Sequence, residues 1–406
     1  MNRFRKLLMQ EEEDAITRNN QRALVMQAAS SHILRIQEEE SQWGGSQPGR
    51  QYIARDREAM DRRLKALYFA SPCRFQGDVF RRRYRMRPHV FDQMMYDVAN
   101  HDPYFVQTDD ASCRVGLSTE QKLTCAMRML AYGLPADLSD EFLNVAESTA
   151  LEILSHFTRV IFNVYHNHYL RRPTPADLQW LLDVADKRGF PGMVGSLDCM
   201  HWQWKNCPTA WQGHFTGYKR KPTIILEAVA SYDAWIWHAY FGLPGDREYY
   251  DQCYYLVDGI YPKWGSFMKA IRNPITPEQA HFTKMQESYR KDVERAFGIL
   301  QAHFAIVRGP ARGWDREDLQ YIMMTCIILH NMIVDDEREE DEESPIDLDD
   351  IPTRPRKAQI YERYEDDHEV ERNRPELEEF MTRYRGLDAQ LCIESFKEIW
   401  LITSGT

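Results

Sequence analysis

Residues 193–258 decide the fold; they begin with MVGSLDCMHW and end with CYYLVD. Four segments of this stretch are rich in β-branched and aromatic residues and predict strands, at 193–198, 223–231, 234–242 and 253–258. The first and the fourth of these strands end in an aspartate, Asp198 and Asp258. Helical periodicity replaces this pattern on both sides of the stretch. The sequence therefore predicts an α+β protein with a mixed sheet flanked by helices.

Two helices are predicted after the fourth strand. The first helix spans 282–304, and its apolar stripe consists of Phe282, Met285, Tyr289, Val293, Phe297, Leu300 and Phe304. Glu294 lies beside this stripe, at its polar border. The second helix begins at Asp315, and its apolar run at 322–329 is too short to span a bilayer. Such a run suits a helix packed on the back of a sheet.

The region before the sheet, residues 56–190, is predicted to be helical. Ser118 or Thr119 can N-cap a helix that ends at Gly133, and two further helices follow up to Tyr165. The apolar stripe of the last helix consists of Leu151, Leu154, Phe157, Val160 and Ile161. Three short helices with tight polar turns are typical of a helix-turn-helix, here at 117–165. Most small helical bundles bind no DNA, so a purely structural interpretation stays open.

The two ends of the chain differ in composition from its middle. Residues 1–55 are polar and predict a disordered or loosely helical arm, 335–355 an acidic linker, and 356–406 a helical C-terminal segment. Residues 335–350 alone have a net charge of −10, with eleven acids and one arginine, while the whole chain has −11. The other residues therefore sum to −1, and the acidity does not exclude a basic surface that binds nucleic acid.

Several protein classes are excluded by composition. No apolar run reaches the ~18 residues of a membrane-spanning helix, so no membrane partner is expected. The N-terminus lacks the apolar stretch of a secretory signal. None of the eight cysteines forms a CxxC pair, which argues against a disulfide scaffold and for a reducing compartment. We therefore expect an intracellular protein.

Three acids form a candidate catalytic set. Asp198 and Asp258 end two predicted strands, and Glu294 lies on the helix that follows. Phosphodiester hydrolysis by two divalent ions requires converging carboxylates, and hard oxygen ligands select Mg²⁺ or Mn²⁺. Spacing alone favours a structural role for these residues, because any strand can end in Asp and any helix can expose Glu.

The short sequence motifs around these acids resemble those of a known family. They are GSLDCMHW at 195–202, WKNCP at 204–208, LEAVA at 226–230, YLVDGIYP at 255–262, RKDVERAFG at 290–298 and LHNMI at 329–333. In this order they resemble the PIF/Harbinger transposases of plants, a DDE type that includes the Harbinger-derived nucleases. The resemblance extends from about residue 50 to the end of the chain.

The resemblance implies an RNase-H-like sheet at 191–334 and a transposase or nuclease that cuts and joins DNA. Asp198, Asp258 and Glu294 would be its catalytic triad and would bind two divalent metal ions, Mg²⁺ or Mn²⁺. The family implies DNA as substrate, the nucleus as location, and a Myb-like DNA-binding protein as partner; a homo-oligomer is also compatible with it. One family segment is missing after Gly245, so a catalytically inactive, transposase-derived adaptor on DNA or chromatin is the alternative.

Basic residues are candidate phosphate contacts because Arg and Lys neutralise the DNA backbone. They form three groups: Arg81, Arg82, Arg83 and Arg85, with Arg87 close behind; Lys205, Lys219, Arg220 and Lys221; and Arg290, Lys291 and Arg295. Pairing with nearby acids, or a solvated turn, is the alternative for each group.

His201 lies three residues after Asp198 and could orient that carboxylate or a phosphate, although a lone histidine in a strand is more often structural. A zinc site was also weighed for Cys199, His201, Cys207 and His214. Their spacing lacks the close pairs of a structural zinc site, which argues against it.

Overall fold

The computed structural model describes residues 53–109, 113–217, 220–242, 254–261 and 266–341. The chain divides into two units, Met1–Ala54 and Arg55–Thr406, and every described helix and strand lies in the second unit. The predicted polar arm up to residue 52, the acidic linker beyond 341 and the C-terminal helical segment lie outside the described residues.

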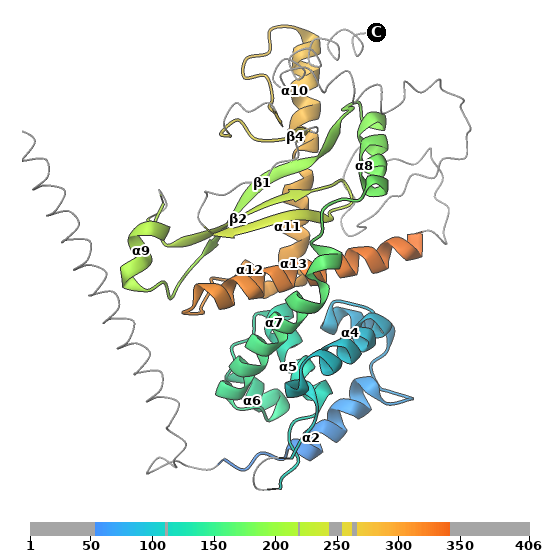
Figure 1. Cartoon of the computed structure of the whole chain (residues 1–406), viewed down its shortest axis with the longest axis vertical. Coiled ribbons are helices and arrows are strands. Elements are labelled where there is room, and N and C mark those ends of the chain that lie inside the picture. The colour runs from blue at the N-terminus through green and yellow to red at the C-terminus, as the bar shows by residue number, and fades with distance from the viewer. Residues whose placement is uncertain (1–52, 110–112, 218–219, 243–253, 262–265, 342–406) are drawn as a thin grey trace, which may run out of the picture. The chain divides into compact units, whose positions relative to one another are not determined.

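The sheet has five strands. They are β1 (Met193–Gln203), β2 (Thr223–Ala230), β3 (Ile236–Gly242), β4 (Tyr254–Leu256) and β5 (Phe267–Met268). The strand order is β3-β2-β1-β4-β5, in which β1, β2 and β3 pair antiparallel while β4 and β5 pair parallel to β1 (Figure 1). This confirms the predicted α+β fold with an RNase-H-like mixed sheet. The two-residue β5 was not predicted because it is too short to show a strand pattern.

Helices precede the sheet, as predicted. They are α2 (Arg57–Leu64), α3 (Gly77–Tyr84), α4 (Pro88–His101), α5 (Thr119–Tyr132), α6 (Leu138–Leu143), α7 (Glu147–Tyr169) and α8 (Pro175–Lys187), with single turns at Lys65–Phe69 and Pro103–Phe105. Ser118 is the N-cap of α5. Its Oγ accepts from the Gln121 N–H at 3.2 Å, and the Gln121 side chain accepts from the Ser118 N–H at 3.0 Å. Gly133, at φ 64°, ends the helix in the left-handed conformation that glycine adopts without strain.

α7 packs along one face against α5 and α13 (Arg316–Asp341). The predicted stripe is confirmed at Phe157 and Ile161, which are fully buried, but it is wrong at Leu151, which is 52% exposed. The stripe is narrower there because α7 starts beside the short α6 and meets its larger partners only further along. The proposed DNA-binding role of this helix-turn-helix stays a prediction.

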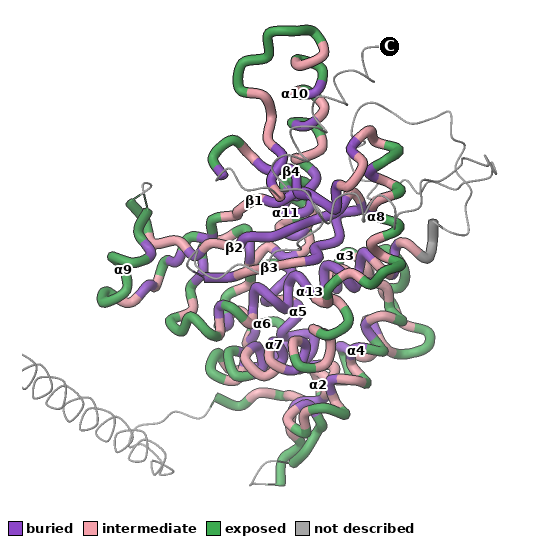
Figure 2. The backbone as a smooth tube through the Cα atoms, turned by 45° about the horizontal axis from the view of Figure 1, so that its top comes forward, coloured by how far each residue is buried: buried purple, intermediate pink, exposed green. Residues whose placement is uncertain are grey.

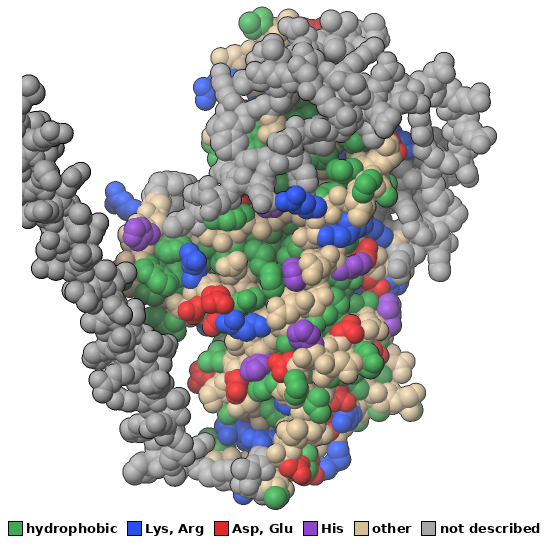
Figure 3. All heavy atoms as spheres, in the orientation of Figure 1, with side chains coloured by type: hydrophobic (Ala, Val, Ile, Leu, Met, Phe, Trp, Pro, Cys, Tyr) green, Lys and Arg blue, Asp and Glu red, His purple; other side chains and the backbone are tan. Residues whose placement is uncertain are grey.

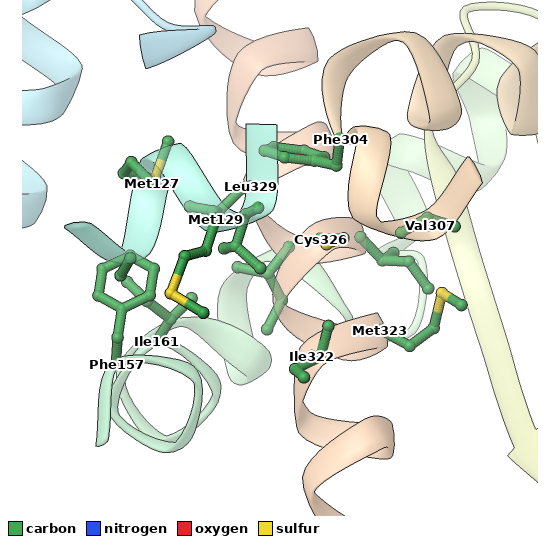
Figure 4. Packing of buried hydrophobic residues seen from close by; sticks show 14 of the residues in the cluster. Met127, Met129, Phe157, Ile161, Phe304, Val307, Ile322, Met323, Cys326 and Leu329 are labelled. Atoms are coloured by element: carbon green, nitrogen blue, oxygen red, sulfur yellow. The ribbon is translucent and has the colours of Figure 1, made fainter. Parts of the chain in front are cut away.

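After the sheet, α10 (Pro277–Tyr289), α11 (Asp292–His303), α12 (Ala305–Arg308) and α13 follow. α13 contacts α7 on one side and β3 on the other, as its apolar run predicts. Figure 4 shows Met129 of α5, Phe157 of α7 and Leu329 of α13 in one packed core. Helices before the sheet and helices after it therefore share a hydrophobic core with the sheet.

Buried Asn331 on α13 joins the sheet to the helices before it. Its Nδ2 donates to the carbonyls of Ile236 on β3 and Tyr169 on α7, at 2.8 and 2.7 Å, and its Oδ1 accepts from the Ile236 N–H at 2.9 Å. These contacts fix the first strand residue of β3 against the end of α7.

Burial differs sharply between elements. Figure 2 shows the central strands and α13 as buried, while the short α9 (Thr209–Phe215), between β1 and β2, is almost entirely exposed. None of the helices within the described residues combines the length and apolar character needed to cross a bilayer.

Candidate functional site

Asp198 and Asp258 lie at the same edge of two parallel strands. The last paired residues of β1 and β4 are Ser196 and Leu256, and each aspartate comes two residues after its strand's member of this pair. The predicted end of the first strand at Asp198 is wrong, because β1 continues to Gln203 in pairing with β2. Asp198 therefore lies inside a strand, at the point where its parallel neighbour has ended.

Asp198 faces the side of the sheet that α10–α12 cover. Side chains alternate along a strand, so Ser196, Asp198 and Met200 share one face. Ser196 Oγ donates to the carbonyl of Tyr289 in α10 at 2.9 Å, and Gln301 of α11 donates to the Met200 sulfur at 2.9 Å. Glu294 lies on α11 between these two anchor points in the chain.

Two helices, α10 and α11, replace the single predicted helix at 282–304. The apolar stripe is confirmed, but Arg290 and Lys291 separate α10 from α11. Arg188 packs its guanidinium on the Tyr289 ring at 3.8 Å and pairs with the buried Asp292 carboxylate at 2.7 Å. Burial raises the pKa of Asp292, although Arg188 and Arg295 oppose the shift. This junction sets the direction in which α11 presents Glu294, and no sequence period indicates it.

The three acids interact electrostatically. The pKa of Asp198 is raised, chiefly by partial burial, and the negative charges of Glu294 and Asp258 raise it further. The Cys199 N–H, which donates to Asp198 Oδ1 at 2.7 Å, and Arg290 oppose the shift. The charges of Glu294 and Asp258, from two other segments of the chain, thus act on Asp198, and the catalytic role of the three acids stays a prediction.

Arg290 pairs directly with one of these acids. Its Nη1 lies 2.5 Å from Glu294 Oε1, one helical turn away, and the Glu294 side chain is 43% exposed. This contact favours pairing with a nearby acid, the alternative stated for Arg290, over a free phosphate contact. The Glu294 carboxylate is therefore paired with a cation of the protein itself.

A buried glutamine holds the strand ends beside Asp258. Gln286 Nε2 donates to the carbonyls of Val257 and Met268, at 3.1 and 3.0 Å. The Tyr261 N–H donates to the Asp258 carbonyl at 3.3 Å and closes a turn directly after Asp258.

A hydrogen-bonded group that sequence analysis missed lies on the opposite face of the sheet. The Tyr261 hydroxyl donates to Cys199 Sγ at 3.2 Å, and the Cys199 thiol lies 3.6 Å from the carboxylate of Glu227, which is only 5% exposed. Burial raises the pKa of the Cys199 thiol to about 11. In the sequence, only the acid Glu227 inside an apolar strand indicates this group. The group links β1, β2 and the residues after β4 on this face of the sheet.

His201 shares the face of Cys199, because strand alternation separates it from Asp198. Its side chain is exposed. The arrangement favours a structural or surface role over a role in orienting the Asp198 carboxylate.

No three His, Cys, Asp or Glu side chains within the described parts of the chain are arranged to hold a metal ion. The zinc alternative at Cys199, His201, Cys207 and His214 thus finds no support. The three acids do not form a closed ligand set either, and Arg290 occupies one oxygen of Glu294.

Most of the arginine cluster at 81–87 contacts the protein itself. Arg81 pairs with Glu337, Arg87 lies 2.5 Å from Asp336, and Arg83 packs on the Phe75 ring at 4.1 Å. Arg85 donates to the Ala131 carbonyl at 3.3 Å, and Arg82 is exposed. These contacts favour the alternative of internal pairing for all of these arginines except Arg82.

The other two basic groups divide between exposed and paired residues. Lys205, Arg220, Lys221 and Lys291 are exposed, and Lys219 lies outside the described residues. Arg295 contacts Asp292 at 3.2 Å, as the alternative predicted.

Comparisons with known proteins bear on the part of the chain that contains the three acids. A family model described as "Plant transposon protein" matches residues 167–249 and 246–341. The two matched segments meet at 246–249, next to Gly245, where the resemblance lacks a segment. Searches of curated proteins and of solved structures find no match. The family match supports a transposon-related family for this chain.

Proposed function

We propose that this protein is a DDE-type transposase or nuclease that cuts and joins DNA phosphodiester bonds with Asp198, Asp258 and Glu294. The observation that supports this most is the electrostatic interaction of these three carboxylates, from β1, the end of β4 and α11. All three lie within the residues that match the transposon family. A purely structural role for each acid would not require the charges of Glu294 and Asp258 to act on Asp198.

The donor chemistry suits Mg²⁺ or Mn²⁺, which prefer carboxylate oxygens. Burial raises the pKa of Asp198, and the negative charges of Glu294 and Asp258 add to the shift, so a cation held there would favour the ionised carboxylate. When bound, a pair of such ions would activate the attacking oxygen and stabilise the leaving oxygen. Asp198, Asp258 and Glu294 would hold these ions, and Arg290, which pairs with Glu294, would lie beside them.

The proposed activity implies DNA as the substrate and the nucleus as the site of action. A Myb-like DNA-binding protein and a second copy of the chain are further proposed partners. All of these follow from the resemblance described above, so they depend on the same catalytic assignment.

The test is a cleavage assay on supercoiled plasmid and on linear DNA duplexes. We expect Mg²⁺-dependent nicking by the wild type and a loss of at least ~100-fold in Asp258→Asn. Glu287→Gln, an exposed acid on α10, is the matched control and should cut like the wild type. Equal cleavage by wild type and Asp258→Asn, or none by either, would remove the catalytic proposal.

The alternative is an inactive, transposase-derived adaptor on DNA or chromatin. Two observations favour it: the pairing of Glu294 with Arg290, and the lack of a closed metal-ligand set within the described residues. The absence of cleavage together with retained DNA binding would support it.

A further inference from the structure

Two segments of this acidic protein contain no acid at all. Residues 199–226 and 295–314 lack Asp and Glu, although the chain has 62 of them in 406 residues. Their cations are Lys205, Lys219, Arg220, Lys221, Arg295, Arg308 and Arg312. A surface built from both segments would therefore attract a polyanion.

The structure holds parts of the two segments side by side. The Ala311 N–H donates to the Gln203 carbonyl at 2.8 Å, and the Lys205 N–H donates back to the Ala311 carbonyl at 2.9 Å. Trp204 Nε1 donates to the Gly313 carbonyl at 2.8 Å, which fixes the residue before Trp314. This rigid pairing lies six residues beyond Asp198, roughly 20 Å along β1.

Two exposed indole rings flank this pairing. Trp314 is 69% exposed, and Trp211 on α9 is 43% exposed. The ring centroids of Trp211 and the buried Trp204 are 6.0 Å apart, so Trp204 packs beside Trp211. Trp204 also holds Gly313, the residue before Trp314, through its hydrogen bond. Lys205 and Arg312 are exposed beside them in the chain.

Large aromatic rings on a soluble surface need an explanation, because exposing them forfeits the free energy of burial. Figure 3 shows hydrophobic side chains together with Lys, Arg and His side chains around α9, at the end of β1 and β2. The acids that follow Trp314 are used within the start of α13: Asp315 Oδ1 accepts from the Glu317 N–H at 2.6 Å, and Glu317 and Asp318 bind Arg159 at 3.2 and 2.9 Å.

We propose that the surface of Trp211, Trp314, Lys205 and Arg312 binds an unpaired DNA strand that extends from the cleavage site. Exposed indoles stack on unpaired bases, whose π-faces a duplex hides, and the cations neutralise the phosphates. An unpaired DNA strand matches both features of this surface, because its bases suit the rings and its phosphates suit the cations. The inference rests on the proposed function, because it names the part of the DNA substrate that this surface holds.

The test measures fluorescence anisotropy of labelled oligonucleotides in EDTA, with the full chain and no metal. We expect single-stranded DNA to bind more tightly than duplex of the same length. Trp314→Ala should weaken single-strand binding roughly ten-fold, within the range for loss of one stacked base. Tyr96→Ala, which removes a 66% exposed ring on α4, is the matched control and should leave binding unchanged.

Two further variants keep the outcome interpretable. Trp211→Phe retains a ring against Trp204 and should weaken binding less than Trp314→Ala. The double variant Lys205→Ala and Arg312→Ala should make the plot of log binding constant against log salt concentration shallower, by about one unit of slope. Equal affinity of Trp314→Ala and wild type, or a preference for duplex or RNA over single-stranded DNA, would overturn the inference.

The failure of this inference differs from that of the proposed function. Asp258→Asn should bind single-stranded DNA like the wild type in EDTA, whether or not cleavage occurs. Loss of cleavage with binding retained would reject only the catalytic assignment. Metal-dependent cleavage together with unaltered binding by Trp314→Ala would reject only the Trp211–Trp314 surface.

Discussion

Asp198 shows how a proposed catalytic residue can oppose the stability of the fold. Its pKa is raised because burial and the charges of Glu294 and Asp258 disfavour the ionised form. The folded state therefore binds the Asp198 proton more tightly than the unfolded chain does. The resulting stability is present at low pH and is lost as the pH rises through the folded pKa, so at pH 7 the charge lowers the free energy of unfolding.

Replacing Asp198 by Asn should therefore raise the melting temperature in EDTA, on the order of a degree or two. The amide keeps the size of the side chain and removes its charge. Thermal melts followed by circular dichroism test this. Added Mg²⁺ should stabilise the wild type and not Asp198→Asn. A lower melting temperature for the variant in EDTA would mean that the carboxylate stabilises the fold.

At this scale the sequence identified the acids but not their partners. Asp198, Asp258 and Glu294 could be named as candidate catalytic residues because each lies in a sequence motif that resembles the family. The pairing of Arg290 with Glu294 and the burial of Glu227 depend on side-chain directions, which sequence spacing leaves undetermined. The same limit applies to His201, whose face follows only once the strand is known to continue past Asp198.

At the scale of elements, the junction of α10 and α11 controls the site. Arg188 from the end of α8 pairs with Asp292 and packs on Tyr289, which fixes both helices on either side of Arg290. The sequence predicted one continuous helix here because its apolar stripe has no interruption. The break is imposed by a tertiary contact with a residue about one hundred positions earlier.

Arg188→Met should destabilise the protein by about 3–5 kcal/mol, because it leaves the Asp292 carboxylate buried without its main partner. The double variant Arg188→Met and Asp292→Asn should recover part of this loss, since the unpaired charge is gone. Urea denaturation of the wild type, both single variants and the double variant provides the comparison. Additive losses in the double variant would show that the pair does not act as a unit.

The strands were easier to predict than the helix junction. β2 and β3 are confirmed within two residues of their predicted bounds because β-branched and aromatic residues dominate them. β1 was predicted too short, because after Asp198 its outward positions become polar, and a half-exposed strand resembles a loop in sequence.

At the scale of the whole molecule, two neighbouring histidines, the fully buried His330 and the half-buried His303, lie where the sheet and the helices before and after it meet. His330 Nε2 donates to the Ala234 carbonyl at 2.8 Å, and its Nδ1 lies 3.4 Å from His303 Nδ1. Burial lowers the pKa of His330 to about 4 and that of His303 to about 3. Both are neutral in the folded protein at pH 7.

The stability should therefore fall as the pH drops below the unfolded histidine value of about 6.5. The unfolded chain binds these protons first, so His330 alone should cost about 2 kcal/mol between pH 6.5 and 5. Urea melts at pH 7, 6 and 5 measure this. His303→Gln should make the dependence shallower, while His168→Gln, an exposed histidine on α7, should leave it unchanged. A pH-independent stability over this range would contradict lowered pKa values at His303 and His330 in the folded protein.

Asn331 tests the connection between the sheet and the helices directly. Asn331→Ala would leave the Ile236 N–H and two carbonyls without partners, at a cost of about 3 kcal/mol. Asn167→Ala, on the exposed side of α7, is the control and should stay within about 0.5 kcal/mol of the wild type. Denaturation curves compare the two, and equal losses would show that Asn331 does not join these layers.

The central claim is that three acids from separate segments act together on a divalent ion, and calorimetric titration with Mn²⁺ tests it most directly. We predict that the wild type and Glu287→Gln bind Mn²⁺ with the same affinity, and that Asp198→Asn, Asp258→Asn and Glu294→Gln each weaken it at least ~10-fold. Unchanged Mn²⁺ binding in any one of the three, or no binding by the wild type, would contradict the account.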